Sequence, residues 1–164
     1  MSGAMPRIVM PDEGKRVTLY EVGFRFLVQS QDSGGTLAIV ETEIPSGTLV
    51  KPHRHTREDE FSYVLAGVVG ARLGDTEVKL PAGSAVVKPR GQPHALWNIG
   101  PTPARVLEIL TPGGFERYFE EMAPVLLAHG DEAEGRFYEL AEQYGIEIMD
   151  DWVAELESKH AVKL

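Results

Sequence analysis

Hydrophobic and polar residues alternate in short runs over the first two thirds of the chain, a pattern that predicts β-strands. The runs are rich in β-branched and aromatic residues, and turn residues such as Gly34-Gly35, Ala82-Gly83 and Gly100-Pro101 separate them. Gly74-Asp75 suits a two-residue hairpin. The expected strands are VTLYEV, FRFLVQ, TLAIVETEI, FSYVL, VVGARL, TEVKL, SAVVK and ARVLEIL. Many short antiparallel strands without intervening helices predict a sandwich or barrel over residues 17–112.

The period becomes helical after the sequence TPGG at 111–114, so residues 113–164 are expected to form an α-helical tail. Two helices are predicted over 115–127 and 131–144, and a third amphipathic stretch over 152–160. Asp131 is a suitable N-cap and Gly145 a suitable end of the second helix. Their apolar faces consist of Phe115, Phe119, Met122 and Leu126 in the first helix, and Phe137, Leu140, Ala141 and Tyr144 in the second. These faces are expected to pack on the barrel or on a second subunit.

The composition limits the function classes. At 164 residues the chain can bury one substantial core. Its formal net charge of -9 argues against nucleic-acid and anionic-membrane partners, which need clustered Lys and Arg. The absence of cysteine excludes disulfides, thiolate catalysis and Cys-type zinc sites. No apolar run of about 20 residues or signal-peptide pattern occurs, so a cytoplasmic location is expected. Within the N-terminal segment 1–16, MSGAM is compatible with a cloning remnant and receives no role.

Two histidines one residue apart stand before a group of acidic residues in GTLVKPHRHTREDE. In a strand, His53 and His55 would project to the same face and could both reach one ion. Glu60 is the carboxylate expected to join them, rather than Glu58 or Asp59, because it leads directly into the strand EFSYVL. Imidazole and carboxylate suit Fe, Ni, Mn, Zn or Cu.

A further histidine of the barrel segment, His94, follows a Pro/Gly-rich turn where a strand would resume. It is the fourth candidate ligand. The two histidines of the tail, His129 and His160, are expected to be exposed or to cap helices, with no role in the site.

The two stretches together resemble the signature motifs of the cupin superfamily. The first reads G-x5-H-x-H-x4-E-x6-G and the second G-x5-P-x-G-x2-H-x3-N, separated by residues 68–82. The matching residues are Gly47, His53, His55, Glu60 and Gly67, then Gly83, Pro89, Gly91, His94 and Asn98. The resemblance covers about residues 37–110 and implies an all-β fold: the double-stranded β-helix, or jelly-roll, of a cupin barrel, followed here by the α-helical C-terminal tail.

The resemblance also implies a metal site. It makes His53, His55, Glu60 and His94 the ligands of one divalent transition-metal ion, with Fe, Ni, Mn, Zn and Cu left open. These ligands leave a net charge of about +1, which suits an anionic oxygen donor such as an enolate. Asn98, four positions after His94, is expected to support the ligands by hydrogen bonding. The alternative is a cupin barrel that binds no metal.

Strand alternation places Ser62 and Val64 on the face of Glu60, and Leu96 on that of His94, so these residues either line the pocket or fill the barrel core. The tail, with PGGFERYFEEMAP and ELAEQYGIEI, is similar to that of single-domain cupins related to quercetin 2,3-dioxygenase. The similarity implies a metal-dependent dioxygenase for a small enolic or phenolic, flavonol-like substrate, with Glu60 as a catalytic base. A metal-dependent isomerase, epimerase or lyase, and a non-catalytic cupin that binds a small molecule, are the alternatives.

Besides the small-molecule substrate, the resemblance implies a second copy of the chain as partner, in a homodimer. Phe61, Tyr63 and Trp97 are expected to point away from the ligands. They would supply apolar contact area for the dimer or pack against the tail helices.

Overall fold

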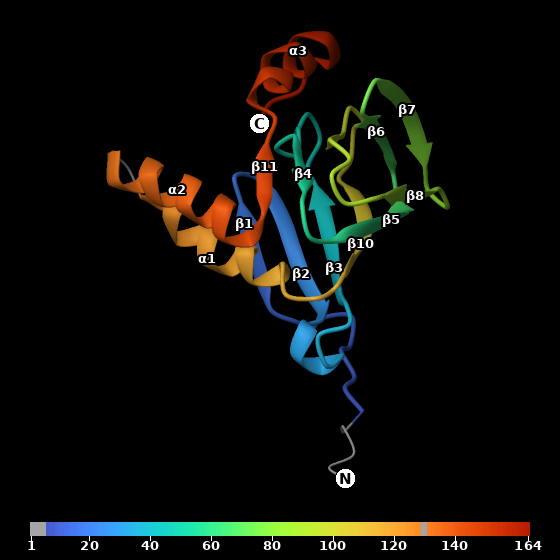
Figure 1. Cartoon of the computed structure of the whole chain (residues 1–164). Helices are drawn as coiled ribbons and strands as arrows, with labels where there is room; N and C mark the ends of the chain where they lie inside the picture. The colour runs from blue at the N-terminus through green and yellow to red at the C-terminus, as the bar shows by residue number, and fades with distance from the viewer. Residues whose placement is uncertain (1–5, 129–130) are drawn as a thin grey trace.

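The computed structural model describes residues 6–128 and 131–164, which form two antiparallel β-sheets and three α-helices (Figure 1). The six-stranded sheet has the order β1-β2-β3-β10-β5-β8, and the five-stranded sheet the order β11-β4-β9-β6-β7. The first contains β1 (Arg16–Leu19), β2 (Val22–Val28), β3 (Ala38–Ile44), β10 (Ala104–Thr111), β5 (Asp59–Ala66) and β8 (Ala85–Lys88). The second contains β11 (Ile146–Ile148), β4 (His53–His55), β9 (His94–Trp97), β6 (Val68–Leu73) and β7 (Thr76–Pro81). A 3-10 turn, η1 (Ser30–Asp32), precedes β3.

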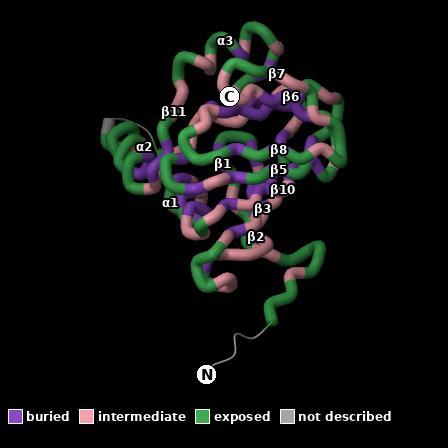
Figure 2. The backbone as a smooth tube through the Cα atoms, turned by 45° about the vertical axis from the view of Figure 1, so that its right-hand side comes forward, coloured by how far each residue is buried: buried purple, intermediate pink, exposed green. Residues whose placement is uncertain are grey.

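The inner faces of the two sheets enclose the core, as strand alternation requires. In β5 the residues Glu60, Ser62 and Val64 are buried while their neighbours in sequence are more exposed. One end of the barrel is filled by an apolar cluster of Ile44, Val64, Val69, Ala71, Leu96, Ala104 and Val106. Buried positions concentrate where the sheets and α1 meet, whereas the N-terminal segment is largely exposed (Figure 2). The predicted all-β jelly-roll with a helical C-terminal part is therefore confirmed.

The predicted turns at Gly74-Asp75 and Ala82-Gly83 are confirmed. Gly74-Asp75 closes the β6–β7 hairpin. Gly47, Gly67, Gly83 and Gly91 all have positive φ angles, between 77° and 90°. At Gly67 an added Cβ would also lie 3.1 Å from Ala104, so this position is restricted both by its backbone conformation and by its neighbour.

The run VTLYEV predicts a single strand, and this prediction is wrong. The chain reverses at Tyr20 and Glu21, and β1 pairs with β2 as a hairpin. Tyr20 has a φ angle of 53°, in the left-handed region where glycine or asparagine is usual. The turn therefore carries no local sequence signal, and its tyrosine side chain lines the cavity described below.

The helical tail packs on the barrel in two places. The helices α1 (Glu116–Leu127) and α2 (Asp131–Tyr144) match the predicted ranges closely. They join β1 and β2 in an apolar cluster that includes Phe24, Phe115, Met122 and Leu140 (Figure 1). Gly145 ends α2 with a φ angle of 65°, as predicted, whereas the side chain of Asp131 lies outside the described residues.

The helix α3 (Asp150–His160) covers another part of the barrel, through a cluster of Leu49, Ala95, Trp97, Leu156 and Val162. Trp97 is therefore buried against the tail, which leaves Phe61 and Tyr63 as the exposed aromatic residues of the set expected on the outer face. The strand β11 between α2 and α3 was not expected, and it pairs with β4. No helix in the described ranges is long and apolar enough to cross a membrane.

Candidate metal centre

The four predicted ligands converge inside the barrel from three strands. His53 and His55 lie on β4, Glu60 begins the inward face of β5, and His94 lies on β9 directly opposite His53. One donor atom from each of the four lies within 4.8 Å of the donor atoms of the others. The spacing H-x-H works as predicted, because β4 directs both imidazoles to the same face.

Backbone carbonyl groups fix the proton positions on two of the imidazoles. Nδ1 of His53 lies 2.6 Å from the Lys51 carbonyl oxygen, and Nδ1 of His94 lies 3.0 Å from that of Gln92. Because a carbonyl oxygen can only accept, each Nδ1 carries a proton, and in the neutral form of each ring Nε2 presents a lone pair to the cluster. These two Nε2 atoms are 3.2 Å apart. Two lone pairs at this separation repel each other, and a cation between them would remove the repulsion.

In the described ranges, the other two donors, His55 and Glu60, each carry a buried atom without a hydrogen bond. Nε2 of His55 and Nε2 of His94 lie 3.6 Å and 3.1 Å from Oε2 of Glu60. Within the described ranges, His55 Nδ1, Glu60 Oε2 and Glu58 Oε2 are buried without a hydrogen bond. The 3.7 Å between His55 Nδ1 and Glu58 Oε2 is too long for one. Three imidazoles and a carboxylate with unsatisfied lone pairs fit a divalent ion, so the cluster is able to bind a metal.

A buried charged network next to the cluster was not predicted. Nζ of Lys88 lies 2.9 Å from Oε2 of Glu60, outside hydrogen-bond geometry, and 3.2 Å from Oε2 of Glu108. Ser62, which was expected near the ligands, donates a hydrogen bond of 2.5 Å to the same Glu108 oxygen. Burial raises the pKa of Glu108 to about 7, although Lys88 opposes this shift. The sequence did contain a sign of this network, because Lys88 and Glu108 occupy inward-facing positions in the alternating pattern of their strands.

The remaining predicted site residues have different outcomes. Leu96 lines the cavity, whereas Val64 belongs to the apolar core cluster. The prediction for Asn98 is wrong. Its amide donates to the carbonyl groups of Ile44 and Thr102, and its oxygen accepts from the Gly100 amide, because the chain turns after β9 and the side chain stabilises that loop.

One of the two tail histidines, His160, differs from the prediction. His160 is not simply exposed: its ring stacks on Trp97, with centroids 4.3 Å apart, and its Nε2 lies 3.0 Å from Glu77. It packs α3 onto the barrel, because Trp97 lies on β9 and Glu77 on β7. It lies outside the ligand cluster. His129 lies outside the described residues.

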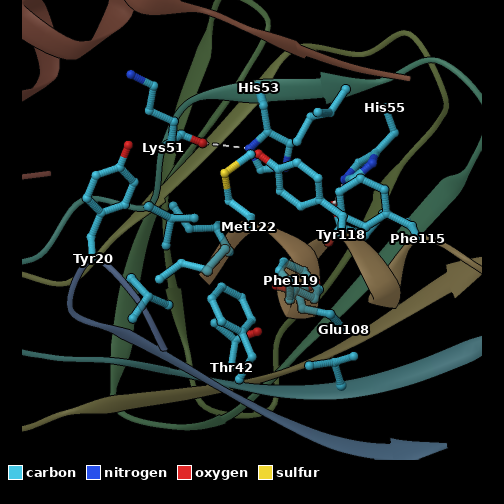
Figure 3. A pocket seen from close by; sticks show the side chains of 18 of the residues that line it. Tyr20, Thr42, Lys51, His53, His55, Glu108, Phe115, Tyr118, Phe119 and Met122 are labelled. Atoms are coloured by element: carbon cyan, nitrogen blue, oxygen red, sulfur yellow. Dashed lines mark hydrogen bonds and ion pairs between the residues drawn. The ribbon is translucent and has the colours of Figure 1, made fainter. Parts of the chain in front are cut away.

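A mainly apolar cavity of about 80 Å³ adjoins the four ligands (Figure 3). Its wall combines inward residues of the first sheet with one face of α1. The apolar part includes Val22, Phe24, Val40, Phe115, Phe119 and Met122. The edge of the Phe115 ring meets His55, with centroids 4.3 Å apart. A metal ion held by the four ligands would therefore lie at the polar end of an apolar cavity.

The metal-free protein is expected to lose stability as the pH falls from about 6.5 to about 4. Burial, partly opposed by Glu60, lowers the pKa of His55 from 6.5 to about 4. Between these values the unfolded chain binds a proton that the folded chain excludes, so the free energy of unfolding decreases as the pH falls. At about 1.4 kcal/mol per pKa unit, protonation of His55 should lower the free energy of unfolding by on the order of 3 kcal/mol over this pH range. His53, whose pKa burial lowers well below its usual value, acts in the same direction.

Urea unfolding of chelator-treated protein at about pH 7 and about pH 5 measures this difference. The raised pKa of Glu108 acts in the opposite direction, because its contribution is lost as the pH rises towards about 7. His55→Gln, which cannot titrate, should flatten the pH dependence. An equal slope in this variant and the wild type would contradict the assignment to His55.

Comparisons with known proteins agree with this architecture. The model of the cupin domain family matches residues 40–110. The chain is 24% identical over 136 residues to quercetin 2,3-dioxygenase from Bacillus subtilis, which covers 83% of this chain and 38% of that protein. It is 32% identical over 89 residues to the tetracenomycin polyketide synthase protein TcmJ from Streptomyces glaucescens, which covers 54% and 60% of the two chains. The chain thus spans less than two thirds of the length of either relative.

Two solved structures show the same fold. KdgF from Halomonas sp. superposes with a TM-score of 0.61 at 20% identity, over 69% of this chain and 99% of that one. The polyketide cyclase RemF from Streptomyces resistomycificus superposes with a TM-score of 0.58 at 26% identity, over 65% and 80% of the two chains.

Proposed function

Residues 40–110 match the cupin domain family, and from this premise we propose that the protein is a metal-dependent dioxygenase acting on a small enolic or phenolic compound. One observation carries the proposal: three imidazoles and one carboxylate converge at the polar end of an apolar cavity. The likeness to quercetin 2,3-dioxygenase supports it, because the match covers 83% of the chain and so reaches beyond the cupin domain.

His53, His55, Glu60 and His94 would hold the ion. A bound divalent ion would supply positive charge that favours the ionised form of an enolic hydroxyl. Glu60 is the carboxylate placed to accept the hydroxyl proton, since its Oε2 is buried and has no hydrogen bond in the described structure. The ammonium group of Lys88 holds this oxygen in place by an ion pair. The apolar walls of the cavity would exclude water from the reacting groups.

A second candidate is non-oxidative chemistry of the lyase or isomerase type at the same site. It is favoured by the two relatives named for polyketide biosynthesis, TcmJ at 32% identity and RemF at 26%. Such a reaction would use the ion only as a Lewis acid. The third alternative, a cupin that binds a small molecule without turnover, requires the same ligand cluster.

An oxygen electrode separates these functions. The protein is purified without a metal-affinity step, analysed for metals, and reconstituted in parallel with Fe, Ni, Mn, Zn and Cu. Flavonols, diketones and catechols are then screened as substrates. We expect near-stoichiometric metal and oxygen uptake that depends on both the metal and the compound. Conversion without oxygen uptake would favour the second candidate, and metal-dependent binding without conversion the third. Metal far below stoichiometry after reconstitution would contradict all three.

A further inference from the structure

We propose that Tyr118, a residue of α1 outside the matched cupin domain, donates a hydrogen bond to the ligand oxygen that approaches the four-residue cluster. Together with the aromatic face of α1, this makes the tail the part of the chain that selects small, single-ring phenolic or enolic ligands. The inference rests on the proposed function and specifies the substrate class of the same site.

The ring of Tyr118 is fixed by its neighbours. Its side chain is 5% exposed and stacks on Phe115, with centroids 5.0 Å apart. Phe119 and Tyr144 meet it edge to face at 6.1 Å and 5.8 Å. A ring held on several sides keeps its hydroxyl group in one place, which is what a positioning group requires.

Among the described residues, the hydroxyl group of Tyr118 has no hydrogen-bond partner. It lines the cavity and forms no hydrogen bond with any residue in the described part of the chain. Figure 3 shows it directed towards His53. Nδ1 of His53 is not available to bond this hydroxyl group, because that nitrogen already donates a hydrogen bond to the Lys51 carbonyl oxygen. Because this hydroxyl group lines the cavity and is not among the fully buried atoms, an oxygen atom of a ligand that enters the cavity can reach it and accept its hydrogen bond.

The chemistry of this hydroxyl suits an anionic oxygen. Burial raises the pKa of Tyr118 above its usual value, so the group keeps its proton and remains a donor. A phenolic hydroxyl bonded to an enolate or phenolate forms a short, charge-assisted hydrogen bond. The oxygen that approaches the imidazoles would therefore receive both the charge of an ion and a hydrogen bond from the opposite wall.

The rest of the cavity limits the shape of the ligand. Thr42, from β3, also lines it, and its hydroxyl group is buried without a partner in the described structure. In the view of Figure 3, Thr42 lies well away from His53. The volume of about 80 Å³ is far below the roughly 300–1,000 Å³ of most ligand pockets. A flat single ring with polar groups at both ends fits this space better than a full flavonol.

Binding of 4-nitrocatechol tests the inference, because its visible spectrum reports both binding and ionisation. The protein is loaded with Zn²⁺, which is redox-inert, and titrated with the probe. We expect Tyr118→Phe to bind it at least about tenfold more weakly, since a hydrogen bond to a charged group contributes about 1.5 kcal/mol or more. The pKa of the bound probe should rise, whereas zinc content and melting temperature should stay at least as high as in the wild type.

Tyr144→Phe is the matched control. It removes the same atom from the same aromatic cluster, but that hydroxyl donates to Glu121 outside the cavity, so affinity for the probe should not change. Wild-type affinity in Tyr118→Phe would overturn the inference and leave the proposed function intact, because the probe would still bind. A lower melting temperature with unchanged affinity would assign the hydroxyl a structural role and would also overturn it. If the zinc-loaded wild type does not bind the probe, the proposed function itself is contradicted.

Discussion

Replacement of His94 by alanine is expected to abolish stoichiometric metal binding. Its Nε2 lies 3.2 Å from that of His53 and 3.1 Å from Oε2 of Glu60, so it closes the donor set opposite β4. Loss of an outer partner of a ligand already weakens metal binding by about 10–100-fold, and loss of a ligand should cost at least about 100-fold. Elemental analysis after dialysis against the metal measures the difference.

A thermal-shift measurement gives a second readout of the same variant. A ligand present at 1,000 times its dissociation constant stabilises the folded state by about 4 kcal/mol. The wild type should therefore melt at a higher temperature when metal is added, and His94→Ala should show little shift. The control is His160→Ala, which removes a half-buried imidazole that packs on Trp97, away from the cluster. Its metal content should equal that of the wild type, and a stoichiometric ion in His94→Ala would refute the proposed ligand set.

The convergence of the four donors could be predicted because each depends on local strand parity. His53 and His55 share a face for the same reason that Glu60, Ser62 and Val64 do. The hairpin at Gly74-Asp75 was predictable from its residues. These features require only the neighbouring sequence and the resemblance of the two motifs.

The features that could not be predicted depend on contacts between distant segments. Tyr20 occupies a left-handed turn because β1 and β2 pair there, although its side chain disfavours that conformation. Asn98 lies an even number of residues after His94, as expected of a residue that supports a ligand, yet its amide donates to the carbonyl groups of Ile44 and Thr102 in the loop region after β9. The aromatic face of α1 was visible in the sequence, but its position on the cavity wall depends on how the tail folds back.

The buried network shows the same limit, because only the tertiary structure reveals which charges face each other. Lys88 is 2% exposed and lies between two carboxylates that are each 9% exposed, Glu60 and Glu108. Burial alone would lower the pKa of Lys88, but the two carboxylates raise it above its usual value. The ammonium group is therefore charged, and it compensates two buried acids at once.

Replacement of Lys88 by methionine is accordingly expected to destabilise the protein by about 3–5 kcal/mol, the usual cost of leaving a buried charge without its partner. Urea unfolding of the metal-free protein at about pH 8, where Glu108 is largely ionised, should show the full effect. The matched control is Lys159→Met, since Lys159 pairs with Glu77 while its own side chain is 54% exposed, and such a pair contributes at most about 1 kcal/mol.

The pH and a second substitution separate charge from packing in this variant. Without the ammonium group the pKa of Glu108 should rise further, because Lys88 is the main group that lowers it. Near pH 6 the carboxyl group would then be protonated and neutral, so the destabilisation should be smaller than at pH 8. Adding Glu108→Gln to Lys88→Met removes one uncompensated charge and should recover part of the lost stability at pH 8. If the loss is independent of pH and Glu108→Gln recovers none of it, Lys88 acts through its packed alkyl chain, and the charge network does not stabilise the site.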